Sequence, residues 1–378
     1  MGKKKQKIRA DFRKGHQGRT RHADLTRDYL RDDLQQDKIL KNERVSGKGE
    51  LTRKRTVVGS ESKESDAGFT VERQVDTSES LRGRVLSVHG LASVVAADDG
   101  QTYRCATRRV LKNLSTDQRH IVVAGDIVYF RREGSSQEGL IERVEPRHSV
   151  LCRTSRKRPH ILVANVDELL IMASAAEPML KPNLIDRFLV EAERNRIPAL
   201  ICINKIDLVE PADLQPLAGV FGQMGYPVLL VSAEKGIGLE RLRQIVAGKQ
   251  SVVAGQSGVG KSSILNGIEP GLHLRVREVS TENQKGKHTT TTARLIPLQM
   301  GGYVVDTPGI RQFQLWDVIP EEVAGYYRDL RPFVNLCRFQ NCTHLHEADC
   351  AVKDAVADGR LDVRRYESYC HLFEGDLL

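Results

Sequence analysis

The segment GQSGVGKSS, Gly255–Ser263, has the residue types and spacing of a phosphate-binding loop. It fits G-x-x-x-x-G-K-S, follows the apolar run SVVA and precedes a helical run, whereas a plain glycine-rich turn would not need these flanks. Its glycines let backbone N–H groups surround phosphate oxygens, its lysine brings a cation to the β and γ phosphates, and the serine directly after the lysine suits Mg²⁺. The predicted nucleotide-binding residues are Gly255, Gln256, Ser257, Gly258, Val259, Gly260, Lys261, Ser262 and Ser263, with Ser262 also a magnesium ligand.

A base-reading motif, Asn204-Lys205-Ile206-Asp207, follows the apolar run ALICI. A carboxylate there accepts from two guanine donors at once, and adenine presents no such pair, so the motif selects GTP over ATP. The aliphatic stem of the lysine can cover the base. The run VSA, Val231–Ala233, ends the next predicted strand, where a backbone N–H can face guanine O6. A surface turn is the alternative for either motif alone. The predicted base-binding residues are Asn204, Lys205, Asp207, Ser232 and Ala233.

A third motif, DTPG at Asp306–Gly309, follows the strand-like run YVV. In GTPases, an acidic residue at a strand end beside the phosphate loop holds a water that is bound to magnesium. Asp306 is predicted to have this role. Gly309 is predicted to offer its backbone N–H to the γ-phosphate.

The base reader precedes the phosphate loop in this chain, whereas an ordinary GTPase has the opposite order. A sheet tolerates the reversal if the same strands become neighbours. Joining the old termini and cutting after the magnesium strand gives the observed order, so a circularly permuted GTPase domain is predicted. The chain after Gly309 then leads directly into the last module, which the γ-phosphate state can move.

Cysteines and histidines cluster in CRFQNCTHLHEADC, with the spacing C-x4-C-x-H-x5-C. Three thiolates and one imidazole make a closed tetrahedral site, which suits one structural zinc ion rather than a catalytic one. Reduced cysteines in a core are the alternative, but the surroundings are polar and the segment is short. His346 competes as a ligand and is placed outside the ligand set. The predicted ligands are Cys337, Cys342, His344 and Cys350.

The strands and helices that position these motifs are predicted to form several domains. Short runs of alternating polarity predict a small antiparallel barrel of about five strands, of the OB-fold type. Strands alternating with helices then predict a doubly wound α/β domain. The predicted division is a basic, mostly disordered arm and linker (1–80), the all-β barrel (81–152), the α/β P-loop GTPase domain (153–317) and a small, mostly α zinc-binding module (318–378).

The chain of 378 residues carries a net charge of +9, which favours a polyanionic partner such as RNA. No stretch approaches the ~18–20 uninterrupted apolar residues of a membrane span, and the basic N-terminus lacks the apolar region of a signal peptide. A cytoplasmic protein without a membrane partner is therefore expected.

The permuted order, the motifs GQSGVGKSS, GKHTTTT and DTPGI, the preceding barrel and the following cysteine module closely resemble the RsgA (YjeQ) family of GTPases that depend on the small ribosomal subunit. The resemblance covers about residues 81–378. It implies a GTP-hydrolysing monomer that uses Mg²⁺, binds the small subunit and its rRNA near the decoding region, and assists late maturation.

The resemblance also identifies Lys285–Leu295 as switch I. A threonine there would ligate magnesium, with Thr290 preferred and Thr291 second. His288 would position the attacking water, because Ile310 after DTPG cannot orient a water as glutamine could.

Two alternatives stay open. The protein could be an RNA-binding assembly factor whose nucleotide site is a structural clamp without turnover. A DNA-binding regulator with an accessory phosphate loop ranks third, because no helix-turn-helix pattern occurs.

Overall fold

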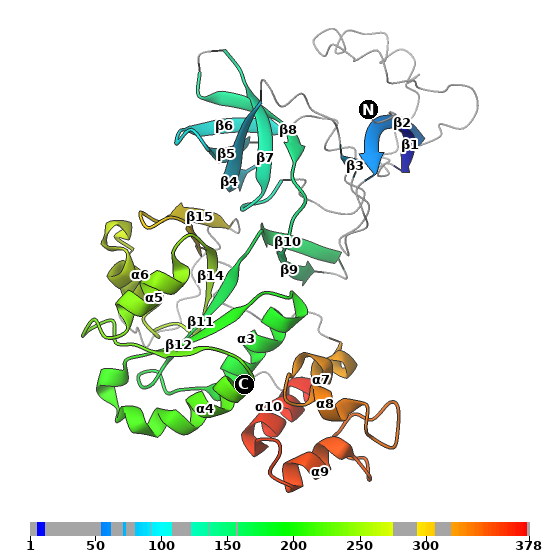
Figure 1. Ribbon diagram of the computed structural model, residues 1–378, viewed down its shortest axis with the longest axis vertical. Helices are drawn as coiled ribbons and strands as arrows, with labels where there is room; N and C mark the ends of the chain where they lie inside the picture. The colour runs from blue at the N-terminus through cyan, green and yellow to red at the C-terminus, as the bar shows by residue number, and fades with distance from the viewer. Residues whose placement is uncertain are drawn as a thin grey trace, which may run out of the picture. The chain divides into compact units, whose positions relative to one another are not determined.

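The computed structural model describes residues 6–11, 54–61, 71–72, 80–90, 92–107, 122–134, 136–155, 158–274, 293–306 and 319–375 (Figure 1). Their contacts divide the chain into two compact units. The first comprises residues 1–85, 89–122 and 126–146, and the second comprises residues 86–88, 123–125 and 147–378.

The first unit contains a closed five-stranded barrel. Its strands follow the order β4-β5-β6-β8-β7, and β7 pairs back to β4. Alternate residues point inward, and Val85, Val95 and Phe130 are each 0% exposed, so the alternation seen in the sequence is the alternation of the barrel wall. The five predicted strands are thus confirmed as β4 Leu81–His89, β5 Ala92–Ala97, β6 Thr102–Thr107, β7 Ile127–Arg132 and β8 Glu138–Val144. The barrel was predicted to be antiparallel, but β6 and β8 pair in parallel.

Three further strands lie within the predicted basic arm. They are β1 Gln6–Asp11, β2 Lys54–Glu61 and β3 Val71–Glu72, paired antiparallel in that order. The prediction of a mostly disordered arm did not anticipate them, and the remainder of residues 1–79 lies outside the described residues.

The second unit is built on a six-stranded sheet of order β13-β12-β11-β14-β16-β15. Every neighbouring pair is parallel except β15–β16. The central strands β11 and β12 are buried along their whole length, which explains why they are continuous apolar runs. The strands are β11 Glu168–Ser174, β12 Ala199–Asn204, β13 Val228–Leu230, β14 Gln250–Ala254, β15 Arg294–Pro297 and β16 Tyr303–Asp306, with the hairpin β9 Val150–Ser155 and β10 Arg158–Ala164 before them.

Helices cover both faces of this sheet. On one face Ile185, Phe188 and Leu189 of α3 pack on the apolar side chains of β11 and β12. On the other face α5 and α6 form a second core with Leu170 and Val304. None of the described helices combines the length and the apolar composition that crossing a bilayer requires. The helices are α3 Pro182–Arg194, α4 Gln215–Gln223, α5 Leu239–Val246 and α6 Lys261–Ile268, with short 3₁₀ turns η2 Ile206–Leu208, η3 Pro211–Leu214 and η4 Pro270–Leu272.

The end of the chain, residues 319–375, forms a small helical module, here called the C-terminal module. Its core includes Tyr327, Leu330, Val352 and Tyr369, and Val190 of α3 belongs to the same cluster. The module is therefore packed on the α/β part of its own unit. Its elements are η6 Pro320–Glu322, α7 Val323–Tyr326, α8 Arg331–Val334, α9 Ala351–Ala357 and α10 Val363–Glu374.

Candidate nucleotide-binding site and metal centre

The phosphate loop connects β14 to the N-terminus of α6, as its sequence predicts. Gly255 and Gly260 have φ angles of +146° and +91°. A Cβ on Gly255 would lie 2.1 Å from the carbonyl oxygen of Met172, and one on Gly260 would lie 2.3 Å from Nδ2 of Asn204. Both positions therefore need glycine, because of backbone conformation and because of the close approach of neighbouring elements.

Lys261 begins α6, and its ammonium group bends back over the loop. Its Nζ donates to the carbonyl oxygens of Gly255 and Gln256 at 2.8 and 2.6 Å. Phosphate oxygens are acceptors as well, so the ammonium group can bind a phosphate in the same way. The N-terminus of the helix, which is positively polarised, also favours an anion there. Ser262 is the second residue of the same helix and is half-buried. The loop therefore brings a lysine ammonium and a serine hydroxyl together at the start of α6, the groups that a phosphate-binding loop uses.

Asn204 joins the base-reading motif to the phosphate loop. It ends β12 and is 2% exposed. Its Nδ2 donates to the carbonyl oxygen of Val259 at 2.9 Å, and its Oδ1 accepts from the backbone N–H of Ala233 at 3.0 Å. Three segments that are distant in sequence thus meet at one side chain. The Ala233 N–H, which we predicted to face guanine O6, is directed to Asn204 in this conformation.

Asp207, the predicted guanine reader, is exposed and is held by its neighbour Ser232. The Ser232 hydroxyl donates to Oδ1 of Asp207 and accepts from the backbone N–H of Lys235 at 3.0 Å. Ser232 is 0% exposed. The Asp207 carboxylate is therefore held in its orientation by a hydroxyl that lies in the protein interior.

The turn between β11 and α3, residues 175–181, contacts the base-reading motif at two points. The backbone N–H of Ala175 donates to the carbonyl oxygen of Asn204 at 2.8 Å. The Nζ of Lys205 donates to the carbonyl oxygen of Glu177. Sequence reasoning missed these contacts, and no signal could have revealed them, because backbone carbonyl and N–H groups are common to nearly all residue types.

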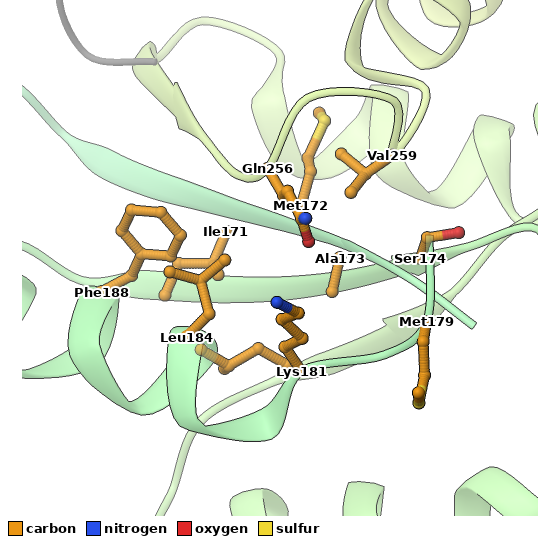
Figure 2. A pocket seen from close by; sticks show the side chains of 11 residues that line it. Ile171, Met172, Ala173, Ser174, Met179, Lys181, Leu184, Phe188, Gln256 and Val259 are labelled. Carbon is orange, nitrogen blue, oxygen red and sulfur yellow. The ribbon is translucent and has the colours of Figure 1, made fainter. Parts of the chain in front are cut away.

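A small pocket lies beside the phosphate loop, between the end of β11 and the start of α3 (Figure 2). Leu184 and Phe188 of α3 line it together with Ile171 of β11 and Gln256 of the loop. The lining is mostly apolar, and none of the base-reading residues reaches it. The pocket therefore marks where α3 packs next to the phosphate loop, and it shares Gln256 and Val259 with the predicted phosphate-binding residues.

Several predicted site residues lie outside the described part of the chain: His288, Thr290 and its alternative Thr291, and Gly309. Asp306 is described by its backbone alone and ends β16. Val305 of that strand pairs with Val252 of β14 in parallel register, so both strands end at the edge of the sheet that carries the phosphate loop.

The predicted zinc ligands come together in the C-terminal module. One ligand atom from each of Cys337, Cys342, His344 and Cys350 lies within 4.8 Å of all the others. The Sγ of Cys337 is 3.4 Å from Nδ1 of His344 and 3.8 Å from Sγ of Cys350. Tetrahedral ligands at normal Zn–N and Zn–S lengths are separated by about 3.6 to 3.8 Å, so the donor set fits one zinc ion.

Side chains around this cluster fix the loop that carries His344. Glu347 accepts from the backbone N–H groups of Thr343, Leu345 and His346 at 2.7, 3.1 and 3.2 Å. Burial acts to raise the pKa of Glu347, but a hydrogen bond from the Thr343 hydroxyl at 2.7 Å and those from backbone N–H groups, including Thr343 and His346, lower that pKa to about 2. His346 is exposed and its ring is not in the cluster. Sequence reasoning missed Glu347, although an acid between the histidines and the last cysteine of such a loop is a usable signal.

Tyrosines of α10 hold the same loop from the other side. The hydroxyl of Tyr366 donates to the carbonyl oxygen of His344, and that of Tyr369 donates to the carbonyl oxygen of Thr343, both at 2.7 Å. The loop that carries His344 is therefore joined directly to the last helix.

Comparison with known proteins agrees with this geometry. The profile of the family described as RsgA GTPase matches residues 144–316. The small ribosomal subunit biogenesis GTPase RsgA of Chlorobaculum parvum is 39% identical, over 78% of this chain and 98% of the relative. The protein of the same name from Thermotoga petrophila is also 39% identical, over 77% of this chain and 95% of the relative.

Solved structures give the same result. The crystal structure of YjeQ from Thermotoga maritima matches with a TM-score of 0.65 and 36% identity, over 78% of this chain and 98% of that one. YloQ, described as a circularly permuted GTPase, matches with a TM-score of 0.62 and 30% identity, over 80% of this chain and 97% of that one. With a relative 39% identical matched over nearly its full length, and with the base reader placed before the phosphate loop, the chain belongs to the RsgA GTPase family.

Proposed function

We propose that this protein hydrolyses GTP on the small ribosomal subunit, assists the late maturation of that subunit and leaves it when GTP is hydrolysed. The observation that carries the nucleotide part is the position of Asn204, whose side chain joins the base reader to the phosphate loop. The ribosomal part is supported by the relatives, which are named small ribosomal subunit biogenesis GTPases.

The reaction is GTP plus water to GDP plus phosphate. Asp207 accepts from the two guanine donors, and the stem of Lys205 covers the base. Lys261 contacts the β and γ phosphates, and the loop N–H groups hold the remaining oxygens. Mg²⁺ neutralises charge on the phosphates when bound; Ser262 and Thr290 would be its ligands, with Thr291 the alternative to Thr290, and Asp306 would hold one of its waters.

His288 is proposed to position the attacking water. Ile310, the residue after DTPG, lacks the polar group that orients water in other GTPases. The chain alone should therefore turn over slowly, and contact with the small subunit should accelerate it by fixing His288. The backbone N–H of Gly309 would report the γ-phosphate to the segment leading into the C-terminal module.

The flanking parts are proposed to bind rRNA. The barrel order β4-β5-β6-β8-β7, with β6 and β8 parallel, supports an OB-fold, which commonly binds nucleic acid. One structural zinc ion held by Cys337, Cys342, His344 and Cys350 would stabilise the C-terminal module. The net charge of +9 fits an RNA partner. A cytoplasmic monomer is proposed.

Substitution of His288 by alanine tests whether the protein is an enzyme or a nucleotide clamp. Loss of a group that positions water should lower kcat by about 10²- to 10⁴-fold and leave the Kd for GTP unchanged. Stopped-flow binding of a fluorescent GTP analogue and phosphate release measure the two quantities. His273→Ala is the matched control, because His273 is exposed and follows η4. Tight GTP binding by the wild-type protein without turnover under any condition would instead establish the clamp.

A further inference from the structure

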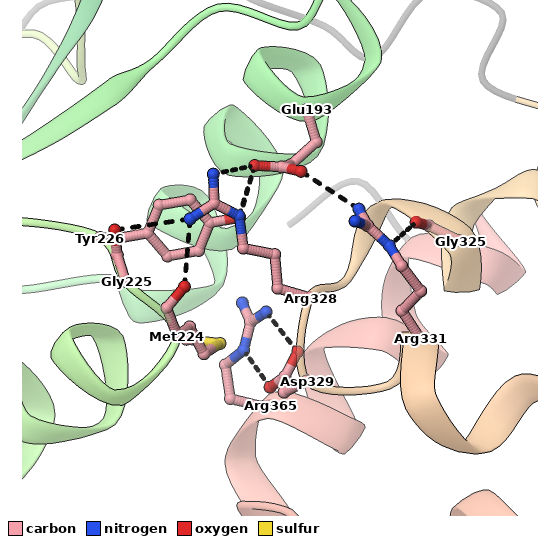
Figure 3. A network of polar contacts seen from close by, with 9 residues as sticks. All are labelled: Glu193, Met224, Gly225, Tyr226, Gly325, Arg328, Asp329, Arg331 and Arg365. Carbon is pink, nitrogen blue, oxygen red and sulfur yellow. Dashed lines mark hydrogen bonds and ion pairs between the residues drawn. The ribbon is translucent and has the colours of Figure 1, made fainter.

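The C-terminal module contacts α3 through a cluster of charged groups around Glu193, the Glu193 cluster (Figure 3). Nε of Arg328 lies 2.7 Å from Oε1 of Glu193, and Nη2 of Arg331 lies 3.1 Å from Oε2. The Arg328 guanidinium also stacks 4.1 Å from the centroid of the Tyr226 ring and donates to the carbonyl oxygen of Met224 at 3.1 Å. This cluster holds the end of α3 and the turn after α4 against the module.

A second contact is buried. Arg365 of α10 donates from Nη1 to Oδ1 of Asp186 on α3 at 2.6 Å. Its Nε and Nη2 each donate to the carboxylate of Asp329 at 2.9 Å. The side chains of Arg365 and Asp186 are 2% and 0% exposed. Separating α3 from the module would break the buried Arg365–Asp186 pair, while Arg365 would keep Asp329, which belongs to the module itself. Breaking a buried ion pair costs free energy, so the buried triad, Asp186–Arg365–Asp329, opposes any independent movement of α3 and the module.

The other end of α3 follows the turn that contacts the base-reading motif. Asp186 lies in the first turns of the helix, which begins at Pro182 and follows directly from the β11–α3 turn, residues 175–181. Ala175 and Glu177 of that turn hold Asn204 and Lys205, as described above. Proline at positions 178 and 182 restricts the backbone between these contacts and the helix. A shift of α3 is therefore transmitted to the anchor of Lys205.

We propose that the C-terminal module is a positioning element for guanine binding. By holding α3 through Arg365 and Glu193, it fixes the β11–α3 turn, whose Glu177 carbonyl keeps the Lys205 stem over the base. This inference rests on the proposed function, because it requires guanine nucleotide to bind next to Lys205. It defines a route between module and nucleotide that does not pass through the switch segments. By linkage, a partner that pulls the module from α3 weakens guanine nucleotide binding, and bound nucleotide strengthens the module contact.

The test measures dissociation of a fluorescent GDP analogue from Glu193→Gln and Arg365→Lys by stopped flow. Both variants should release the analogue between about 2- and 30-fold faster than wild type, the range reached by side chains that couple distant sites. The KM for GTP should rise while kcat at saturation stays unchanged, because no reacting group is altered. Glu193→Gln keeps the buried triad intact, so it tests the inference even if Arg365→Lys fails to fold.

Two controls separate this effect from a general loss of stability. Arg360→Met alters an exposed arginine of the same module that contacts Asp358 and Phe333 of the module itself, and it should leave the rate unchanged. In a Lys205→Met background, Glu193→Gln should have a smaller effect, because the anchored side chain is gone and only the contact between Ala175 and Asn204 remains.

Wild-type rates in folded Glu193→Gln and Arg365→Lys, or an undiminished effect in the Lys205→Met background, would overturn this inference and leave the proposed function intact. Failure of the wild-type protein to bind guanine nucleotide would overturn both.

Discussion

At the scale of single residues, the guanine site depends on side chains that hold other side chains. Asn204 uses both ends of its amide, one on the phosphate loop and one on Ala233. Ser232 fixes the Asp207 carboxylate from a fully buried position. We propose that these contacts orient Asn204 and Asp207 for the base, so that less ordering is needed when nucleotide binds.

Asp207→Asn should weaken GTP binding by about 10- to 100-fold, because hydrogen bonds to a charged acceptor contribute about 1.5–3 kcal/mol and the amide cannot accept from both guanine donors. Competition between GTP, ATP and a fluorescent GDP analogue measures both affinity and selectivity. Asp213→Asn, on the exposed turn that follows, is the control and should bind as wild type. An Asp207→Asn protein with unaltered preference for GTP would show that another group reads the base.

The residues that could be predicted from the sequence are those whose type is required by chemistry. Gly260 must be glycine because a Cβ would be too close to Asn204. Such a requirement makes the residue type part of a sequence motif, so the position could be predicted. Glu177 could not be predicted, because it acts through its carbonyl oxygen and its side chain carries no signal. The backbone N–H of Ala233 was expected to face guanine O6, but it donates to the Asn204 side chain in this conformation. The sequence could not show this, because the contact involves a backbone group.

At the scale of elements, strand adjacency replaces chain order. β14, which carries the phosphate loop, lies between β11 and β16, although β11 and β12 come first in the chain. The apolar runs were sufficient to predict these strands, since a strand buried on both faces needs a continuous run. The four-residue helices α7 and α8 are too short to show a helical period, so the sequence predicted only a small α module there.

The C-terminal module should lose its fold with its metal. Cys350→Ser removes a ligand that is 1% exposed, and α10 holds the adjacent loop through Tyr366 and Tyr369. We expect about one zinc per chain in wild type and none in Cys350→Ser, with a lower melting temperature. Metal analysis and thermal unfolding measure these quantities. Cys370→Ser, outside the cluster, should retain zinc, and a full zinc content in Cys350→Ser would refute the ligand assignment.

At the scale of the molecule, ion pairs between residues that are distant in the sequence join the C-terminal module to α3. Arg365 and Asp186 are 179 residues apart, and neither stands in a motif. No local pattern predicts such a pair, because it depends on how the completed module packs on α3. In our account the same contact lets the C-terminal module position the guanine site through α3, so a partner that binds the module can affect nucleotide exchange.

The most direct test of the central claim is GTP hydrolysis by the full chain at fixed salt, alone and with small subunits, large subunits or free RNA. The account predicts slow hydrolysis alone and a large increase with small subunits only. Equal, low turnover in all four conditions, with tight GTP binding retained, would contradict it.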